Sequence, residues 1–351
     1  MLTHSTGPSR TTENTLTNIS FSSLVSGKGQ LKYLFFGGKG GVGKTAVAGA
    51  TAYYLSERLG KKTLISSTNP VHSLSSLFGQ DLWRKGTQKI EGTRNLYADE
   101  IDISSTIERY KGDIRERLVQ FLKFADIPVD VEPFIEIATT NPSFEESAMF
   151  DDMVDLILSK NFDAYVFDTA PVAHTYRLLG MSKVYNLWLN KMIKSREESM
   201  SLRAKLSFRK EKILQELKKD PLLASLAGTK RKTEEARTLL TDSEKTAFFF
   251  VTLPLALPIA VIERFITWVQ AFQIPVGGVI VNEVIPKADV ENLSPYVANR
   301  MEEQTGYLRM AGEKFPGMIR AVLPLYDREV NGLEMVSRMA ENLSSGSEAR
   351  I

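Results

Sequence analysis

The sequence predicts an α/β protein with a doubly wound, mostly parallel sheet, helices on both faces and an inserted helical subdomain. Short apolar runs of strand length recur along the chain without alternating polar and apolar residues, which is typical of strands buried on both faces of a parallel sheet. Helical patterns, for example at residues 46–59 and 258–272, separate several of these runs. The predicted strands lie at residues 34–36, 63–66, 165–167, 248–252 and 278–281, with a weaker one at 321–323.

The composition excludes several classes of function. The 351 residues carry a formal net charge of +2, so no overall basic surface indicates a nucleic-acid partner. The absence of cysteine excludes disulfides, thiolate zinc sites, iron–sulfur clusters and thiol catalysis, and only three histidines argue against a catalytic zinc site. No apolar run is long enough to predict a membrane span.

A glycine-rich loop follows the first predicted strand and precedes a predicted helix. It matches the pattern G-x-x-x-x-G-K-[ST], in which glycines let successive backbone N–H groups face a phosphate chain. Lys44 is predicted to neutralise the β- and γ-phosphates and the Thr45 hydroxyl to ligate Mg²⁺, while the helix N-terminus adds positive potential. The chain is therefore expected to bind a nucleoside triphosphate with magnesium. The expected contacts come from Gly38, Gly40, Gly41, Val42, Gly43, Lys44, Thr45 and Ala46.

Two polar segments, residues 67–74 and 167–179, follow the second and third predicted strands. Doubly wound sheets bind ligands at such carboxyl ends of strands. Asp168 is predicted to hold Mg²⁺ through water, the alternative being a helix cap or turn residue. We interpret the two segments as switches that respond to the γ-phosphate; the alternative is that their histidines only pack the loops. The switch residues are Pro70, His72, Pro171 and His174.

These motifs together carry a family resemblance. The form K-G-G-x-G-K-[ST], which begins at Lys39, resembles the deviant Walker A loop. Residues 67–74 resemble S-T-D-P-A-H-S-L and residues 167–179 resemble F-D-T-A-P-x-x-H-T-x-R-x-L, both patterns of the ArsA family. This family comprises arsenical pump-driving ATPases and cytosolic ATPases that deliver tail-anchored membrane proteins. The resemblance spans residues 31 to about 343.

The resemblance implies a P-loop ATPase fold, ATP or ADP with Mg²⁺ as ligands, and a homodimer that nucleotide closes and reopens. It implies that Lys39 reaches the partner's nucleotide, although a solvated surface lysine is the alternative, and that the base contacts Asn282, Pro324 and Leu325. We expect a disordered leader over residues 1–30, an ATPase domain over 31–343 and a flexible tail over 344–351. Residues 100–160 and 182–243 are expected to form the helical subdomain.

Four departures from the family pattern matter. Asn69 stands where the family has the aspartate that orients the attacking water, so we expect hydrolysis to be impaired by very roughly tenfold to a thousandfold. Either an engineered replacement or a natural loss would account for it. The chain has no cysteine thiolates, with which the metalloid-binding members hold the metalloid, and no C-x-x-C motif, with which many targeting members pair two chains through zinc. After the fourth predicted strand, Pro254-Leu255 stands where the family has a P-E pair. The predicted catalytic set is Lys39, Lys44, Asn69 and Asp168.

Two functions follow from the resemblance, both for a cytoplasmic protein that visits the membrane surface. The first is an arsenical pump-driving ATPase that energises a membrane efflux subunit, which the cysteine-free chain without a zinc pair slightly favours. The alternative is a chaperone that delivers a tail-anchored client to a membrane receptor. A DNA-partition or septum-positioning role is disfavoured by the two histidine-bearing segments. Residues that could line a client groove, or simply form subdomain core, are Phe121, Leu122, Phe124, Met149, Met153, Met192, Met200, Leu202 and Leu206.

Overall fold

The fold is built on one eight-stranded sheet in the order β3-β4-β2-β5-β1-β6-β7-β8. The computed structural model describes residues 19–27, 31–67, 73–125, 130–140, 142–168, 221–286 and 294–345, with a few positions between 187 and 202. All paired strands are parallel except β3 and β4, which confirms the predicted doubly wound sheet. The strands are β1 (Tyr33–Gly37), β2 (Thr63–Ser67), β3 (Gln88–Lys89), β4 (Leu96–Glu100), β5 (Ala164–Asp168), β6 (Thr246–Thr252), β7 (Val276–Val284) and β8 (Ile319–Pro324).

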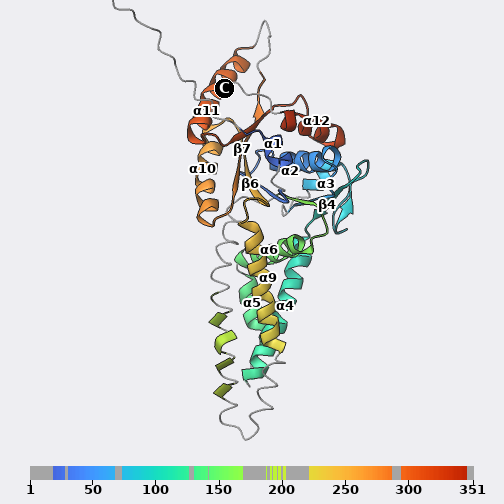
Figure 1. Cartoon of the computed structure of the whole chain (residues 1–351), viewed down its shortest axis with the longest axis vertical. Helices are drawn as coiled ribbons and strands as arrows, with labels where there is room; N and C mark the ends of the chain where they lie inside the picture. The colour runs from blue at the N-terminus through green and yellow to red at the C-terminus, as the bar shows by residue number, and fades with distance from the viewer. Residues whose placement is uncertain are drawn as a thin grey trace, which may run out of the picture.

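Helices cover both faces of this sheet (Figure 1). Leu34 and Phe36 of β1 belong to a core on one face with α1, α2, α3 and α12, whereas Tyr33 and Phe35 belong to a core on the other face with α6, α10 and α11. The central strands are thus apolar on both sides, which explains their continuous hydrophobic runs. The helices named here are α1 (Phe21–Ser26), α2 (Lys44–Tyr53), α3 (Ser73–Phe78), α6 (Pro142–Ser159), α10 (Ala256–Ala271), α11 (Pro295–Lys314) and α12 (Gly332–Ser345). A π-helical turn, η1 (Tyr54–Arg58), continues α2.

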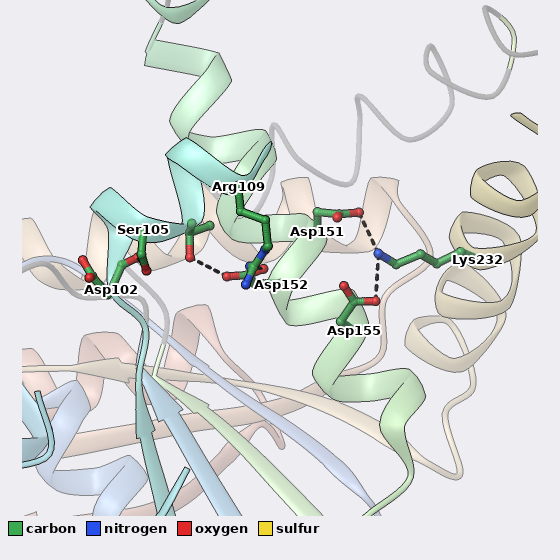
Figure 2. A network of polar contacts seen from close by, with 8 residues as sticks. Asp102, Ser105, Arg109, Asp151, Asp152, Asp155 and Lys232 are labelled. Atoms are coloured by element: carbon green, nitrogen blue, oxygen red, sulfur yellow. Dashed lines mark hydrogen bonds and ion pairs between the residues drawn. The ribbon is translucent and has the colours of Figure 1, made fainter. Parts of the chain in front are cut away.

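A helical lobe projects from one end of the sheet and consists of α4 (Ile103–Ala125), α5 (Glu132–Thr139), α6 and α9 (Pro221–Leu240) (Figure 1). Its first three helices lie between β4 and β5, so they form an insertion, while α9 is the described part of the second predicted helical region. Polar contacts join α4 to α6 and α6 to α9 near the sheet (Figure 2). Asp152 of α6 accepts hydrogen bonds from Thr106 and Arg109 of α4, and Lys232 of α9 lies 2.9 Å from Asp151 and 2.8 Å from Asp155.

The first correction concerns the segment before β1, which we expected to be disordered through residue 30. Residues 21–26 form α1, whose N-cap Ser20 accepts a hydrogen bond from the Ser23 backbone N–H at 3.2 Å. Phe21 and Val25 are fully buried, and the Phe21 ring centroid lies 5.1 Å from that of Phe249. The prediction of disorder is therefore wrong for residues 19–27, because two apolar side chains in a Ser-rich segment suffice to dock a short helix.

The second correction concerns the edge of the sheet, where β3 and β4 were not predicted. Along β4 the buried positions Leu96, Ala98 and Glu100 alternate with half-buried ones. That alternation and the buried glutamate hide the strand from a search for continuous apolar runs. At the other end of the chain, α12 continues to Ser345, two residues into the predicted flexible tail.

Candidate nucleotide-binding site

The phosphate loop connects β1 to α2, and glycine is required at two of its positions. A Cβ on Gly38 would lie 2.3 Å from the carbonyl oxygen of Val251. Gly43 has φ +81°, and a Cβ there would lie 2.3 Å from Asn282 Nδ2. At Gly40 and Gly41, by contrast, a Cβ would meet nothing within 4 Å, so the loop is packed on one side and open on the other.

The phosphate loop ends at the N-terminus of α2, where the first-turn backbone N–H groups have no side-chain cap. Gly43 is the N-cap and provides no side-chain cap, so the first-turn N–H groups remain available to an anion. Lys44 Nζ donates a hydrogen bond to the backbone oxygen of Lys39 at 3.1 Å. Burial lowers the pKa of Lys44, while the negative charge of Asp168 acts in the opposite direction. The loop therefore combines a helix N-terminus with a partly desolvated cation, which suits a polyphosphate.

Hydroxyl groups from three elements, α2, β2 and α3, lie around the buried carboxylate of Asp168 at the end of β5. Thr45 Oγ1 donates to Asp168 Oδ2 at 2.7 Å, and Ser67 Oγ donates to the same atom at 3.1 Å. Ser73 Oγ lies 3.1 Å from Ser67 Oγ. Burial raises the pKa of Asp168, and the hydrogen bond from Thr45 and the charge of Lys44 act the other way. A threonine hydroxyl beside a carboxylate at the phosphate loop is an oxygen donor set that fits Mg²⁺.

A pocket of about 570 Å³ opens beside the loop on the side of α12. Asn282, 3% exposed, donates from Nδ2 to the Val42 backbone oxygen at 3.1 Å and so fixes the loop to β7. Its Oδ1 has no hydrogen-bond partner within the described part of the chain, which leaves a buried acceptor beside the pocket. Such an acceptor fits an exocyclic amino group of a base. The lining residues are Gly41, Gly43, Thr45, Ala46, Ser73, Ser76, Leu77, Asn282, Glu283, Leu325, Tyr326, Arg328, Glu329, Val330, Asn331 and Met339.

The structure brings most of the predicted site residues together. Leu325 lines the pocket, and Pro324, which ends β8, precedes it. Val42 is buried and supports the loop from within, and Lys39 is exposed beside Gly40. Asn69, Pro70, His72, Pro171 and His174 lie outside the described residues.

Ser67 and Ser73, which lie beside Asp168, were not predicted as site residues, and neither were Tyr326 and Arg328 on the pocket wall. The only signal for the two serines was their position at the ends of the first switch segment, and hydroxyl residues in loops are too common to select them. The contact depends on the register of β2 with β5, in which Ser67 pairs with Asp168.

Two of the candidate groove residues agree with the stated alternative that these side chains form subdomain core. Met149 and Met153 of α6 are 9% and 4% exposed, so they belong to the interior and not to an open groove. Leu122 is half-buried, whereas Leu202 is 59% exposed. The side chains of Phe121, Phe124, Met192, Met200 and Leu206 lie outside the described set.

Comparison with known proteins identifies the family. The family model described as anion-transporting ATPase, ArsA, matches residues 31–345, which is nearly all of the chain after α1. The chain belongs to the ArsA family of ATPases. Members of this family hydrolyse ATP, so membership implies that the chain binds a nucleotide.

Relatives of this ArsA-family chain are named either as GET3 or ASNA1 ATPases or as arsenical pump-driving ATPases. ATPase GET3A of Arabidopsis thaliana is 31% identical over 306 residues, covering 87% of this chain and 81% of its own length. ATPase ASNA1 homolog 1 of Paramecium tetraurelia is 28% identical over 316 residues, covering 89% and 92%. A putative arsenical pump-driving ATPase of Halobacterium salinarum is 30% identical over 320 residues, covering 91% of this chain but 45% of that protein.

The described residues hold neither a helix that could span a membrane nor a metal-ligand cluster of histidine and carboxylate side chains. No helix there is long and apolar enough to cross a bilayer. The described part of the chain also holds no group of three histidine, aspartate or glutamate side chains arranged around a metal position. Magnesium at the site above would therefore depend on Thr45, Asp168 and the nucleotide itself.

Proposed function

We propose that this ArsA-family chain binds Mg-ATP in the pocket beside the phosphate loop and uses its turnover to drive a process at a membrane. The observation that carries the proposal is the buried Asn282. It fixes the loop through Val42, and its Oδ1 is an acceptor beside the pocket with no partner among the residues that the structure describes. An adenine amino group would satisfy that oxygen, and the phosphates would then reach the N-terminus of α2.

Thr45 and Asp168 would hold Mg²⁺, Thr45 directly and Asp168 through water. When bound, the ion would neutralise charge on the β- and γ-phosphates. The role of the chain itself is to fix these groups before nucleotide arrives: Thr45 Oγ1 and Asp168 Oδ2 are already 2.7 Å apart. Lys44 stays against the loop through its bond to Lys39, where its charge faces incoming phosphate.

We infer that two copies close around nucleotide, with Lys39 of each reaching toward the other. The exposure of Lys39 at the open side of the loop supports this, because a residue directed at a second subunit has to leave its own subunit's surface. His72 and His174, with Pro70 and Pro171, remain the proposed switch residues, and their segments follow Ser67 and Asp168 of the site.

The cargo has two candidates, the metalloid of a pump and an apolar client helix. The sequence slightly favoured the pump, whereas the surface of the helical lobe favours the client helix. Phe134 and Ile137, which lie three residues apart on α5 and so are neighbours on its surface, are 58% and 71% exposed. Large apolar side chains that cluster on a surface favour an apolar partner. We therefore place the delivery of an apolar client helix to a membrane receptor first. The pump-driving type stays the alternative, supported by the name of the Halobacterium salinarum relative.

A peptide-capture experiment separates these candidates. A fluorescent apolar helix of about 20 residues is titrated with the full chain in Mg-ATP and in Mg-ADP. We expect tighter capture with ATP, and a loss of roughly tenfold or more in the Phe134→Ser/Ile137→Ser variant. Leu257→Ser is the matched control, because Leu257 is also 58% exposed but lies on α10, away from the lobe.

The same preparations are assayed for ATP turnover with arsenite or antimonite. Stimulation by the metalloid together with no capture of the helix would reverse the ranking in favour of the pump. If the parent chain shows no affinity for an adenine nucleotide with magnesium, both candidates fail.

A further inference from the structure

A buried glutamate that the site description leaves unused ends β4. Glu100 is 3% exposed. In the parallel register it pairs with Ser67 of β2, and Ser67 in turn pairs with Asp168 of β5. Glu100 therefore lies in the same row across the carboxyl edge of the sheet as the residues of the magnesium site, one strand further from Asp168 than Ser67.

Glu100 holds the start of α3 through three hydrogen bonds. Its Oε1 accepts from the backbone N–H of Leu74 at 2.7 Å and from that of Ser75 at 3.1 Å, and its Oε2 accepts from Ser75 Oγ at 2.5 Å. The two backbone donors belong to the first turn of α3, where N–H groups have no partner within the helix, and a carboxylate accepts strong hydrogen bonds from such groups. Since a buried carboxylate is costly without donors, this arrangement fixes both the glutamate and the first turn of the helix.

The turn that Glu100 holds carries Ser73. Ser73 immediately precedes Leu74, and its hydroxyl lies 3.1 Å from Ser67 Oγ, which donates to Asp168 Oδ2. Ser73 also lines the pocket beside the loop. A displacement of the first turn of α3 would therefore move Ser73 away from the hydroxyl that supports the carboxylate.

We propose that Glu100 is a positioning residue for magnesium: it fixes Ser73 against Ser67 and so keeps Asp168 oriented toward the ion. The inference rests on the proposed Mg-ATP function. Glu100 acts through the first turn of α3 and Ser73, whose hydroxyl lies beside Ser67 and Asp168, so it contributes to metal affinity and to turnover but not to the binding of metal-free nucleotide.

The chain that follows Glu100 also leads into the first helix of the helical lobe. Two residues after Glu100, Asp102 lies 2.9 Å from Arg84 and accepts from the Ser104 backbone N–H at 3.1 Å, at the start of α4. The short connection from β4 to α4 is thus held to α3 on one side and to the lobe on the other. Figure 2 shows Asp102 beside the polar contacts that join α4 to α6.

The test compares Glu100→Gln and Glu100→Ala with the parent chain. Fluorescent ADP is bound first in EDTA and then titrated with Mg²⁺, and the midpoint of the Mg²⁺ titration is the main readout. We expect the midpoint to rise roughly tenfold in Glu100→Ala and less in Glu100→Gln, because groups behind a metal ligand typically contribute on this scale. The affinity in EDTA should stay within about twofold of the parent's, since the base pocket and phosphate loop are untouched.

Glu57→Ala is the matched control. Glu57 Oε1 also accepts from a backbone N–H, that of Arg94 at 2.8 Å, and from a serine hydroxyl, that of Ser56 at 2.9 Å. It lies in η1, beyond the end of α2 that is remote from the phosphate loop. We expect this variant to lower the melting temperature without moving the Mg²⁺ midpoint.

A double-mutant cycle with Ser73→Ala locates the effect. If Glu100 acts through Ser73, the Glu100→Ala/Ser73→Ala variant should show a Mg²⁺ midpoint well below the product of the two single effects. An unchanged midpoint in folded Glu100→Gln and Glu100→Ala overturns the inference, as do fully multiplicative effects with Ser73→Ala. If the parent binds no ADP in any condition, the proposed function fails and this inference fails with it. If the parent binds ADP but the Mg²⁺ midpoint does not change in the Glu100 variants, only this inference fails.

Discussion

Asn69 is the residue at which the proposed chemistry departs most from the ArsA-family pattern. An amide can hydrogen-bond the attacking water but cannot accept its proton. We predict that Asn69→Asp raises steady-state ATP turnover by roughly tenfold to a thousandfold, the usual scale of a general base. Phosphate release from purified protein measures it, with Asn69→Ala as the control that removes both the amide and the carboxylate. Equal turnover of the parent and Asn69→Asp would show that position 69 does not limit hydrolysis.

Tyr33 gives a pH-dependent prediction at the opposite side of the core. Its hydroxyl donates to the Ile157 backbone oxygen at 3.2 Å, and burial, with the nearby Tyr165 and Glu235, raises its pKa to about 12. Unfolded tyrosine ionises near pH 10, so between about 10 and 12 the folded state keeps a proton that the unfolded state has lost. The contribution of this group to stability is therefore complete below about pH 10 and is lost as the pH rises toward 12.

Urea unfolding at several alkaline pH values measures the Tyr33 effect. The free energy of unfolding of the parent should fall more steeply above pH 10 than that of Tyr33→Phe, which has no ionisable hydroxyl there. Parallel curves for the two proteins would mean that other groups cause the alkaline loss.

Residues of the site differ in how far the sequence could predict them. Gly43, Lys44 and Thr45 are adjacent, and their spacing alone encodes a turn, a cation and a hydroxyl at the start of a helix. Glu100 is aligned with Ser67 and Asp168 only by the pairing of β4, β2 and β5, and Ser73 reaches Ser67 from the start of α3. Their roles depend on register, which a local pattern does not specify.

At the scale of elements, Lys232 of α9 forms ion pairs with two carboxylates of α6, Asp151 and Asp155. Burial alone would lower the pKa of Lys232, but its bonds to Asp155 and Asp151 raise it overall. Lys232→Met would leave the two carboxylates facing each other without a cation. We predict a loss of about 1–2 kcal/mol in the free energy of unfolding, between the values for exposed and buried ion pairs.

Lys230→Met is the control for this prediction on the same helix. Lys230 lies 3.8 Å from Glu234 one turn away, a spacing typical of weak surface pairs. We expect a change below about 0.5 kcal/mol in the same urea titration. Equal losses for the two variants would mean that the bridge to α6 adds nothing beyond an ordinary surface charge.

Six strands and the helices at residues 46–59 and 258–272 were predicted from the sequence, because the strands are continuous apolar runs and these helices lie between them. The elements that were missed are those whose neighbours decide their structure. β4 reads as half-polar because it lies next to a two-residue edge strand, and its buried Glu100 is tolerated only through the donors of α3. Likewise α1 has few apolar residues and forms where Phe249 offers a partner for Phe21.

At the scale of the whole molecule, the proposed cycle requires two copies. We predict that the chain is a dimer in Mg-ATP and largely monomeric in Mg-ADP, and that Lys39→Ala weakens the ATP-dependent dimer. Analytical ultracentrifugation in each nucleotide measures both effects. Lys89→Ala serves as the control, because Lys89 is an exposed lysine on the edge strand β3. Persistence of the dimer in Lys39→Ala would assign that lysine to the solvated surface.

The docking of α1 sets a lower limit on how far the chain can be shortened for laboratory work. A truncation at Leu31 would keep every recognisable motif, yet it would strip the covering from the Phe249 ring. The two lost anchors, Phe21 and Val25, are each worth about 1.5–3 kcal/mol when fully buried. A trimmed preparation would therefore tolerate less heat and adhere more readily to other apolar surfaces, so expression designs should begin upstream of Ile19.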